Sequence, residues 1–206
     1  MDPLSFFCLQ HGRVHSAKVS SVPSIADQVF GGLTDPQMRT RPGTGLNSLV
    51  WLLWHMARVE DVGVNLIVTA GRQVLDEDWS SRLGIRRTDA GHGMTEDELT
   101  EFAARVDIGA VRAYRDAVGL RTRDVVAALE PASWLERVST VDAARLPDWF
   151  KPFLGQPRAF ELGTSAITHN AMHLGEAVTI RSLAGLGGAP SRGGACSQPA
   201  VTGPRS

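Results

Sequence analysis

Two histidines lie four residues apart in the second half of the chain, at His169 and His173. The segment around them, from about Phe160 to Leu186, lacks Pro and spaces its apolar residues with the period of a helix. On a helix, positions four apart differ by about 40° around the axis, so both imidazoles share one face. This spacing suits a borderline divalent ion such as zinc or nickel, although two histidines also share a face by chance.

Glu176 follows three residues after His173 and lies near the same face. Three roles are open to its carboxylate: a metal ligand, an acceptor that orients a ligand, or a base. We take Glu176 as the candidate catalytic residue of this helix.

A third histidine, His55, lies in the middle of another long apolar segment, from about Asn47 to about Val74. The apolar residues there are too numerous for a single stripe, so the predicted helix is buried on more than one side. A lone histidine in such a helix is ordinarily a core residue that is hydrogen-bonded to a neighbour. Its significance therefore depends on what the fold brings beside it.

The rest of the chain predicts further helices and shows no convincing strand alternation. The expected helices span 4–21, 25–33, 95–106 and 108–129, with caps at Ser24, Thr34, Thr95 and Asp107. Two long connections, a polar one at 75–94 and an aromatic one at 131–158, separate the main helices. We therefore expect an all-α fold, a four-helix bundle with long crossover connections.

The aromatic connection is densest between Pro147 and Phe153. Apolar side chains in a loop must be buried somewhere, so this stretch either plugs one end of the bundle or walls a ligand pocket. We favour the plug.

Composition limits the classes of function. The chain has 206 residues, of which 43% are hydrophobic and 21% charged, and a net charge of −1, as expected for one globular domain. Without a basic surplus it is not expected to bind nucleic acid generally, and it lacks the run of about 18 apolar residues that a membrane span needs. Cys8 and Cys196 do not suggest a disulfide framework, so we expect a cytoplasmic protein.

A bundle favours the interpretation of the three histidines as metal ligands, because metal sites in bundles are built from inward-facing side chains of facing helices. Three neutral imidazoles leave a coordination position free, as is typical of catalytic rather than structural sites. We expect the ring nitrogens of His55, His169 and His173 to lie within about 4 Å of each other.

Two stretches of the chain resemble motifs of a known family. Residues 47–61 (NSLVWLLWHMARVED) are similar to the second-helix signature of the DinB/YfiT-like metalloprotein superfamily, and residues 169–176 (HNAMHLGE) to its fourth-helix signature. The resemblance covers about residues 24–185 and implies a DinB-like bundle domain at 24–186. An N-terminal helical segment at 1–23 would belong to the bundle, and the Gly-, Pro- and Ser-rich tail at 187–206 is expected to be disordered.

The resemblance implies a divalent-metal site, zinc or nickel, with His55, His169 and His173 as ligands. Characterised relatives in that family include S-transferases that use mycothiol or bacillithiol and a mycothiol-dependent maleylpyruvate isomerase. The implied function is transfer of a mycothiol-like thiol to an electrophile, or a thiol-dependent isomerisation. Its partners would be a small-molecule thiol and an electrophilic substrate, with neither nucleic acid nor membrane, and a homodimer is left open.

Charged residues beside the first motif have two interpretations each. Arg58, three residues after His55, would either hold an anionic substrate or form a surface ion pair. Glu60 and Asp61 would either orient the imidazoles or be ordinary helix charges.

A second histidine pair, His11 and His15, has the same four-residue spacing in the first predicted helix. We interpret it as surface or helix-packing residues, with an approach of His15 to the metal site as the alternative.

The residues alone do not decide whether the chain turns over a substrate. An alternative to thiol transfer is hydrolysis by metal-bound water with Glu176 as the base. Another is a non-catalytic metal- or small-ligand-binding stress protein. The same three histidines serve all of these functions.

Overall fold

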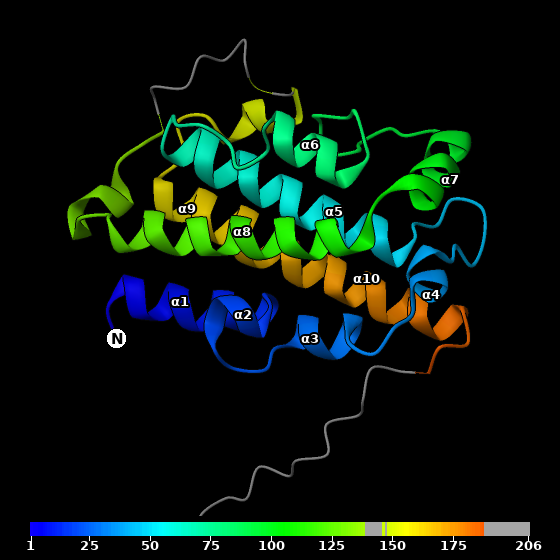
Figure 1. Ribbon diagram of the computed structural model, residues 1–206. Helices are drawn as coiled ribbons and strands as arrows, with labels where there is room; N and C mark the ends of the chain where they lie inside the picture. Colours follow the sequence, from blue (N-terminus) through cyan, green and yellow to red (C-terminus); the bar gives the residue numbers. More distant parts are fainter. Residues whose placement is uncertain (139–145, 147, 188–206) are drawn as a thin grey trace, which may run out of the picture.

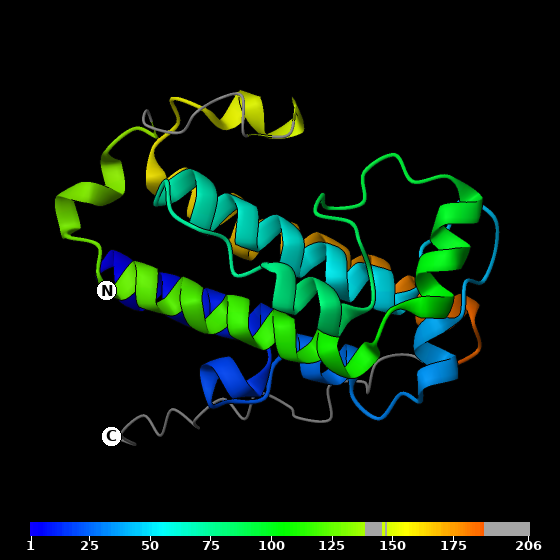
Figure 2. The ribbon, with the colours of Figure 1, turned by 45° about the horizontal axis from the view of Figure 1, so that its top comes forward.

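The computed structural model describes residues 1–138, 146 and 148–187. Its main helices are α1 (Pro3–Val14), α5 (Leu49–Glu60), α8 (Ile108–Ala127) and α10 (His169–Leu183). Helix α5 packs along α8 and against α10, and α1 lies against both α8 and α10 (Figure 1). Figure 2 shows the same long helices from a second direction, with α1 (blue) behind α8 (green). The expected all-α bundle is confirmed.

Shorter helical elements fill the connections between the main helices. They are α2 (Ala17–Ser20), α3 (Ile25–Phe30), α4 (Asp35–Arg39), α6 (Glu77–Leu83), α7 (Glu96–Arg105), α9 (Arg158–Gly163) and the 3₁₀ segments η2 (Pro131–Leu135) and η4 (Asp148–Phe153). The predicted disordered tail lies outside the described residues, apart from Gly187.

Helix starts follow the capping signals in the sequence. Thr34 and Thr95 each form a complete capping box, as predicted. Helix α5 is capped by Ser48, whose side chain accepts from the backbone of the third helical residue. This leaves the Asn47 amide free to donate to Glu176 at 3.0 Å, a contact between the two segments that carry the histidine motifs.

The single helix predicted for residues 4–21 was wrong, because the chain breaks at His15. That residue is extended (φ −108°, ψ 175°), and the backbone N–H of Ser16 donates to the His15 ring at Nδ1. The polar connection at 75–94 was also predicted without a helix, yet it contains α6. Asp76 caps α6 and Gly84 ends it in the left-handed conformation, two signals that the sequence does contain.

Both helices that carry the histidine motifs contain a π-helical segment. Helix α5 continues into η1 (Asp61–Val68), and η5 (Thr164–Thr168) leads directly into α10. The two π segments contact each other. A π turn adds one residue to the helical repeat and is frequent at functional sites. Here η5 sets the rotation at which His169 and the rest of α10 face α5.

The core lies on all sides of α5. Every residue from Leu49 to Val68 is buried, which confirms the predicted burial on more than one side. The largest cluster joins α5 to α8 and α10 through residues such as Leu52, Val118 and Leu174. No helix in the described ranges is long and apolar enough to cross a membrane.

Candidate metal centre

The three predicted ligands come together between α5 and α10. His55 lies in the middle of α5, His169 is the first residue of α10, and His173 follows one turn later. The Nε2 atoms of His55 and His169 are 3.2 Å apart, within the predicted 4 Å. One ligand atom from each of the three rings lies within 4.8 Å of the other two, and the ring centroids are 4.5–4.9 Å apart.

Hydrogen bonds on the far side of two rings fix which nitrogen faces the centre. His55 Nδ1 lies 2.5 Å from the carbonyl oxygen of Ala90, and His173 Nδ1 lies 2.8 Å from Glu176 Oε2. Both acceptors require a proton on Nδ1, which leaves a lone pair on Nε2. A metal-binding histidine ordinarily donates its other N–H to a carbonyl or carboxylate in this way.

His169 differs from its two partners. Its Nδ1 is buried and has no hydrogen-bond partner among the described residues. Its Nε2 faces the lone pair of His55 at 3.2 Å, so one proton between the two nitrogens, or one cation beside them, is needed to avoid repulsion.

Burial keeps two of these imidazoles neutral. It lowers the pKa of His55 to about 3 and, together with the neighbouring His55 and His173, the pKa of His169 to about 2. Neutral imidazole is the form that binds a metal. Nitrogen donors of this kind suit zinc and nickel, so the residues fit the group that the sequence predicted.

Glu176 lies behind His173 rather than at the centre. Its Oε2 accepts from His173 and its Oε1 accepts from Asn47. Of the three roles open from the sequence, this geometry corresponds to the acceptor that orients a ligand. The pKa of Glu176 is lowered, chiefly by the hydrogen bond from His173, so the carboxylate is ionised at neutral pH.

Arg58 is fully buried and has its five N–H groups engaged within the protein. Nη1 donates to Asp61 and Tyr114, and Nη2 donates to the side chain of Gln73 and the Thr88 carbonyl. The remaining Nε donates to a backbone carbonyl at 3.3 Å. Arg58 therefore has no free donor for a substrate in this conformation, and its ion pair with Asp61 is buried rather than on the surface.

Asp61 ties the end of α5 to the connection that follows. Its two oxygens accept from the backbone N–H groups of Val74 and Leu75 and from the Arg58 side chain. These contacts account for its burial within the fold and direct it away from the three imidazoles.

His11 and His15 form a second buried cluster, with Glu60. His11 Nε2 lies 2.9 Å from Glu60 Oε1, and His15 Nε2 lies 3.8 Å from Oε2. All three side chains are fully buried, so the surface position considered for the pair was wrong and the helix-packing alternative holds. Gly119 makes room for His15, because a Cβ there would lie 2.5 Å from the imidazole.

The donor atoms of this second cluster are close enough to hold a metal, but their hydrogen bonds disfavour one. Ser16 donates to His15 Nδ1, so neutral His15 carries its proton on Nε2, the atom that faces Glu60. Glu60 also accepts from Thr122 at 2.8 Å and from Asn170 at 2.9 Å. We interpret the cluster as packing that ties α1, α5, α8 and α10 together.

Burial alone would raise the pKa of Glu60, but His11, His15 and a hydrogen bond from His11 lower it to about 2. Glu60 is therefore an ionised carboxylate inside the bundle. It does not contact the rings of the metal-site histidines, but Asn170, which donates to it, is the neighbour of His169 in the chain.

Within the part of the aromatic connection that is described, Phe150 is buried against η1, in line with the expected plug. Trp149 contacts His92, with 4.1 Å between the centroids of the tilted rings, and the His92 centroid in turn lies 4.9 Å from that of His55. Sequence reasoning missed His92. The signal that could have found it is a histidine between two glycines, Gly91 and Gly93.

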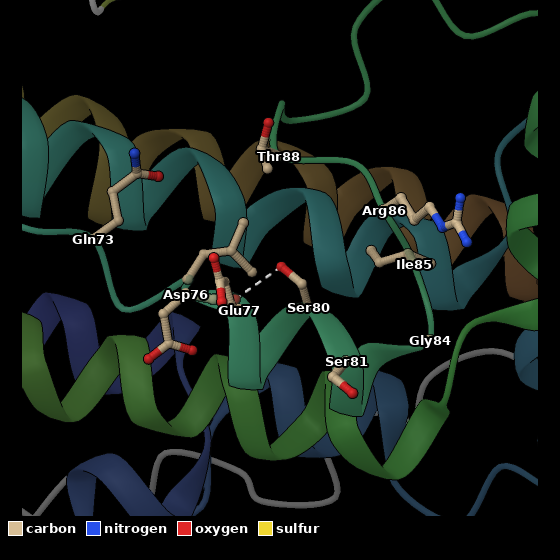
Figure 3. A pocket seen from close by; sticks show the side chains of 10 residues that line it. Gln73, Asp76, Glu77, Ser80, Ser81, Gly84, Ile85, Arg86 and Thr88 are labelled. Carbon is tan, nitrogen blue, oxygen red and sulfur yellow. Dashed lines mark hydrogen bonds between the residues drawn. The ribbon is translucent and has the colours of Figure 1, made fainter.

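A surface hollow lies away from the three histidines. It has a volume of about 680 Å³ and lies beside α6, where it is lined by residues of the 73–88 segment and by none of the three histidines. Figure 3 shows its side chains, among them Gln73, Glu77 and Arg86. We see no arrangement of catalytic groups there and do not connect the hollow with the metal centre.

Comparison with known proteins identifies the class of the fold. The family model of the DinB superfamily matches residues 20–177. The chain therefore belongs to the DinB superfamily.

A solved structure described as a conserved protein from Enterococcus faecalis has a similar fold. The TM-score is 0.63 at 20% sequence identity, and the match covers 89% of this chain and 97% of that chain. At this identity the likeness concerns the fold alone. No curated protein matches the chain significantly in sequence.

Proposed function

We propose that the chain is a divalent-metal-dependent enzyme that transfers a low-molecular-weight thiol of the mycothiol type to an electrophile, or uses the thiol in an isomerisation. The observation that carries the proposal is the convergence of three imidazoles, with the Nδ1 atoms of His55 and His173 hydrogen-bonded to acceptors behind them. Family membership supports it, because the matched region includes both histidine motifs.

The proposed ligands are His55, His169 and His173, and the proposed ion is zinc or nickel. A divalent ion held there would act as a Lewis acid, in whose presence a coordinating thiol is deprotonated. The protein supplies the orientation. Ala90 and Glu176 hold the rings of His55 and His173, and burial keeps His55 and His169 in the neutral form that binds metal.

The hydrogen bonds of Glu176 count against hydrolysis with this residue as the base, because its two oxygens already accept from His173 and Asn47. A water bound to a divalent ion ionises near neutral pH without a separate base, as a bound thiol does. Hydrolysis and non-catalytic binding are therefore the alternatives that the experiment must exclude.

The test is conjugate formation by purified, metal-loaded protein supplied with mycothiol or bacillithiol and a haloaromatic electrophile, followed by mass spectrometry. We expect metal-dependent conjugation with one preferred thiol, and none from His169→Ala, which lacks a ligand. Gly175→Ala is the matched control, because it lies on the same helix, is exposed, and has no atom within 4 Å of the added Cβ. Equal rates in loaded and metal-free protein for every thiol would count against transfer. Thiol-independent hydrolysis of an ester would then favour the water-based alternative.

A further inference from the structure

His92 lies beside the metal centre without belonging to the three-histidine set. Its ring centroid is 4.9 Å from that of His55, and the two rings meet edge to face. The spacing equals that between His55 and His169, which are both in the set. The His92 ring also contacts Trp149, with 4.1 Å between the centroids of the two tilted rings.

The segment that carries His92 is a short exposed turn held on both sides, since Met94 packs on the core and its sulfur accepts from Trp51 Nε1. Ala90 and Gly91 are buried, and Ala90 holds His55 through its carbonyl. His92 and Gly93, by contrast, are exposed. The imidazole therefore projects beside His55 from a two-residue exposed turn between buried Gly91 and the partly buried Met94.

Two glycines give this piece of chain an unusual backbone. Gly91 (φ +85°) and Gly93 (φ +72°) both adopt conformations that side chains disfavour. At Gly91 a Cβ would also lie 2.7 Å from Trp54, so that position is fixed by packing. At Gly93 nothing lies within 4 Å of an added Cβ, so no packing contact holds this side of the turn, where a change of dihedral angles would re-aim His92.

We propose that His92 is a fourth, exchangeable protein ligand of the metal centre. Its ring would move away from Trp149 and donate a nitrogen lone pair to an ion held by the other three histidines. It would return to Trp149 when a substrate took its place. The exchange swaps one neutral nitrogen donor for another ligand and needs no redox partner. This inference rests on the proposed metal site.

The fourth-ligand role follows from the chemistry of the donors. Borderline ions such as zinc accept four nitrogen ligands, and imidazole is among their commonest. The contacts of His92 with Trp149 and with His55 place a fourth imidazole beside the other three. An exchangeable fourth ligand would also occupy the open position of the ion, and so protect the centre, until the substrate arrives.

The experiment compares Co²⁺ binding by the wild-type chain, His92→Ala, His92→Gln and Arg86→Ala, read by visible absorption and by competitive titration with a chelator. Arg86 is the matched control, an exposed residue of the same connection. Both His92 variants should weaken Co²⁺ binding at least about tenfold and should change the ligand-field spectrum. About tenfold is the smallest loss of metal affinity expected when a residue that only orients a ligand is removed. Arg86→Ala should change neither the affinity nor the spectrum. Melting of the metal-free proteins checks that the variants fold.

Wild-type affinity and spectrum in both folded His92 variants would overturn the proposal. His169→Ala in the same titration separates the two levels of the argument. If it loses Co²⁺ while the His92 variants do not, the three-histidine site stands and the fourth ligand falls. If the wild-type chain itself binds no Co²⁺, the proposed metal site fails, and with it this inference.

Discussion

His55 and His169 approach within 3.2 Å through their Nε2 atoms, from different helices 114 residues apart in sequence. The Nδ1 proton of His55 is committed to the Ala90 carbonyl, so its Nε2 offers a lone pair. In the metal-free state His169 must supply the proton between them. A metal would replace that proton and move it to Nδ1 of His169, which is buried without a partner in the described part of the chain. His169 is therefore the ligand that the protein supports least.

Glu176 should matter for metal affinity through His173. In Glu176→Ala the ring loses the acceptor that holds its Nδ1 proton, and we expect metal affinity to fall about 10- to 100-fold. Glu176→Gln keeps the shape of the side chain but not its charge, so the metal affinity of this variant should fall less than that of Glu176→Ala. Calorimetric zinc titration measures both. Unchanged affinity in the Ala variant would leave Glu176 without an orienting role and would revive its assignment as a base.

Two glycine-to-alanine changes should have opposite effects on stability. In α8, Gly119→Ala places a Cβ 2.5 Å from the His15 ring in a fully packed site, which should cost about 1–3 kcal/mol. In α10, Gly175→Ala meets nothing within 4 Å and should stabilise the helix by up to about 1 kcal/mol. Denaturant melts of the two variants test this pair. Stabilisation by Gly119→Ala would mean that His15 is not packed on α8 as described.

Glu161 should make stability depend on pH. Burial raises its pKa from 4.5 to about 7 despite the hydrogen bond from Ser165, so the folded protein holds a proton that the unfolded chain has lost. The contribution of protonated Glu161 to the free energy of unfolding is fully present below pH 4.5. It is lost as the pH rises towards 7, and the total loss is about 3 kcal/mol. Glu161→Gln mimics the protonated acid, so the variant should gain stability over the wild type as the pH rises. A constant difference between pH 5 and 8 would contradict the raised pKa.

The sequence predicted the bundle and the three histidines that converge in it because their signals are local or periodic. The spacing of His169 and His173, the caps at Thr34 and Thr95, and the apolar run around His55 all depend on neighbours a few residues away. The helix boundary at His15 was missed because a local side-chain hydrogen bond competes with the helix there, the His15 ring accepting from the next backbone N–H.

The environment of the charged residues could not be predicted in the same way. Glu60 and Asp61 are neighbours in sequence, yet one faces the histidines of α1 and the other faces Arg58 and Tyr114. Their different partners follow from the rotation of the helix, and the π-helical segment that begins at Asp61 left no sign in the composition. His92 escaped notice because its partner Trp149 lies in a distant connection.

The most direct test of the central claim is metal stoichiometry by elemental analysis after loading with zinc or nickel and removal of the excess. The wild-type chain should retain one ion per chain and His169→Ala none. Folded Glu60→Gln, altered in the second histidine cluster, should still retain one. An empty wild-type chain, or an ion that survives in His169→Ala but is lost in Glu60→Gln, would contradict the assignment of the metal centre to His55, His169 and His173.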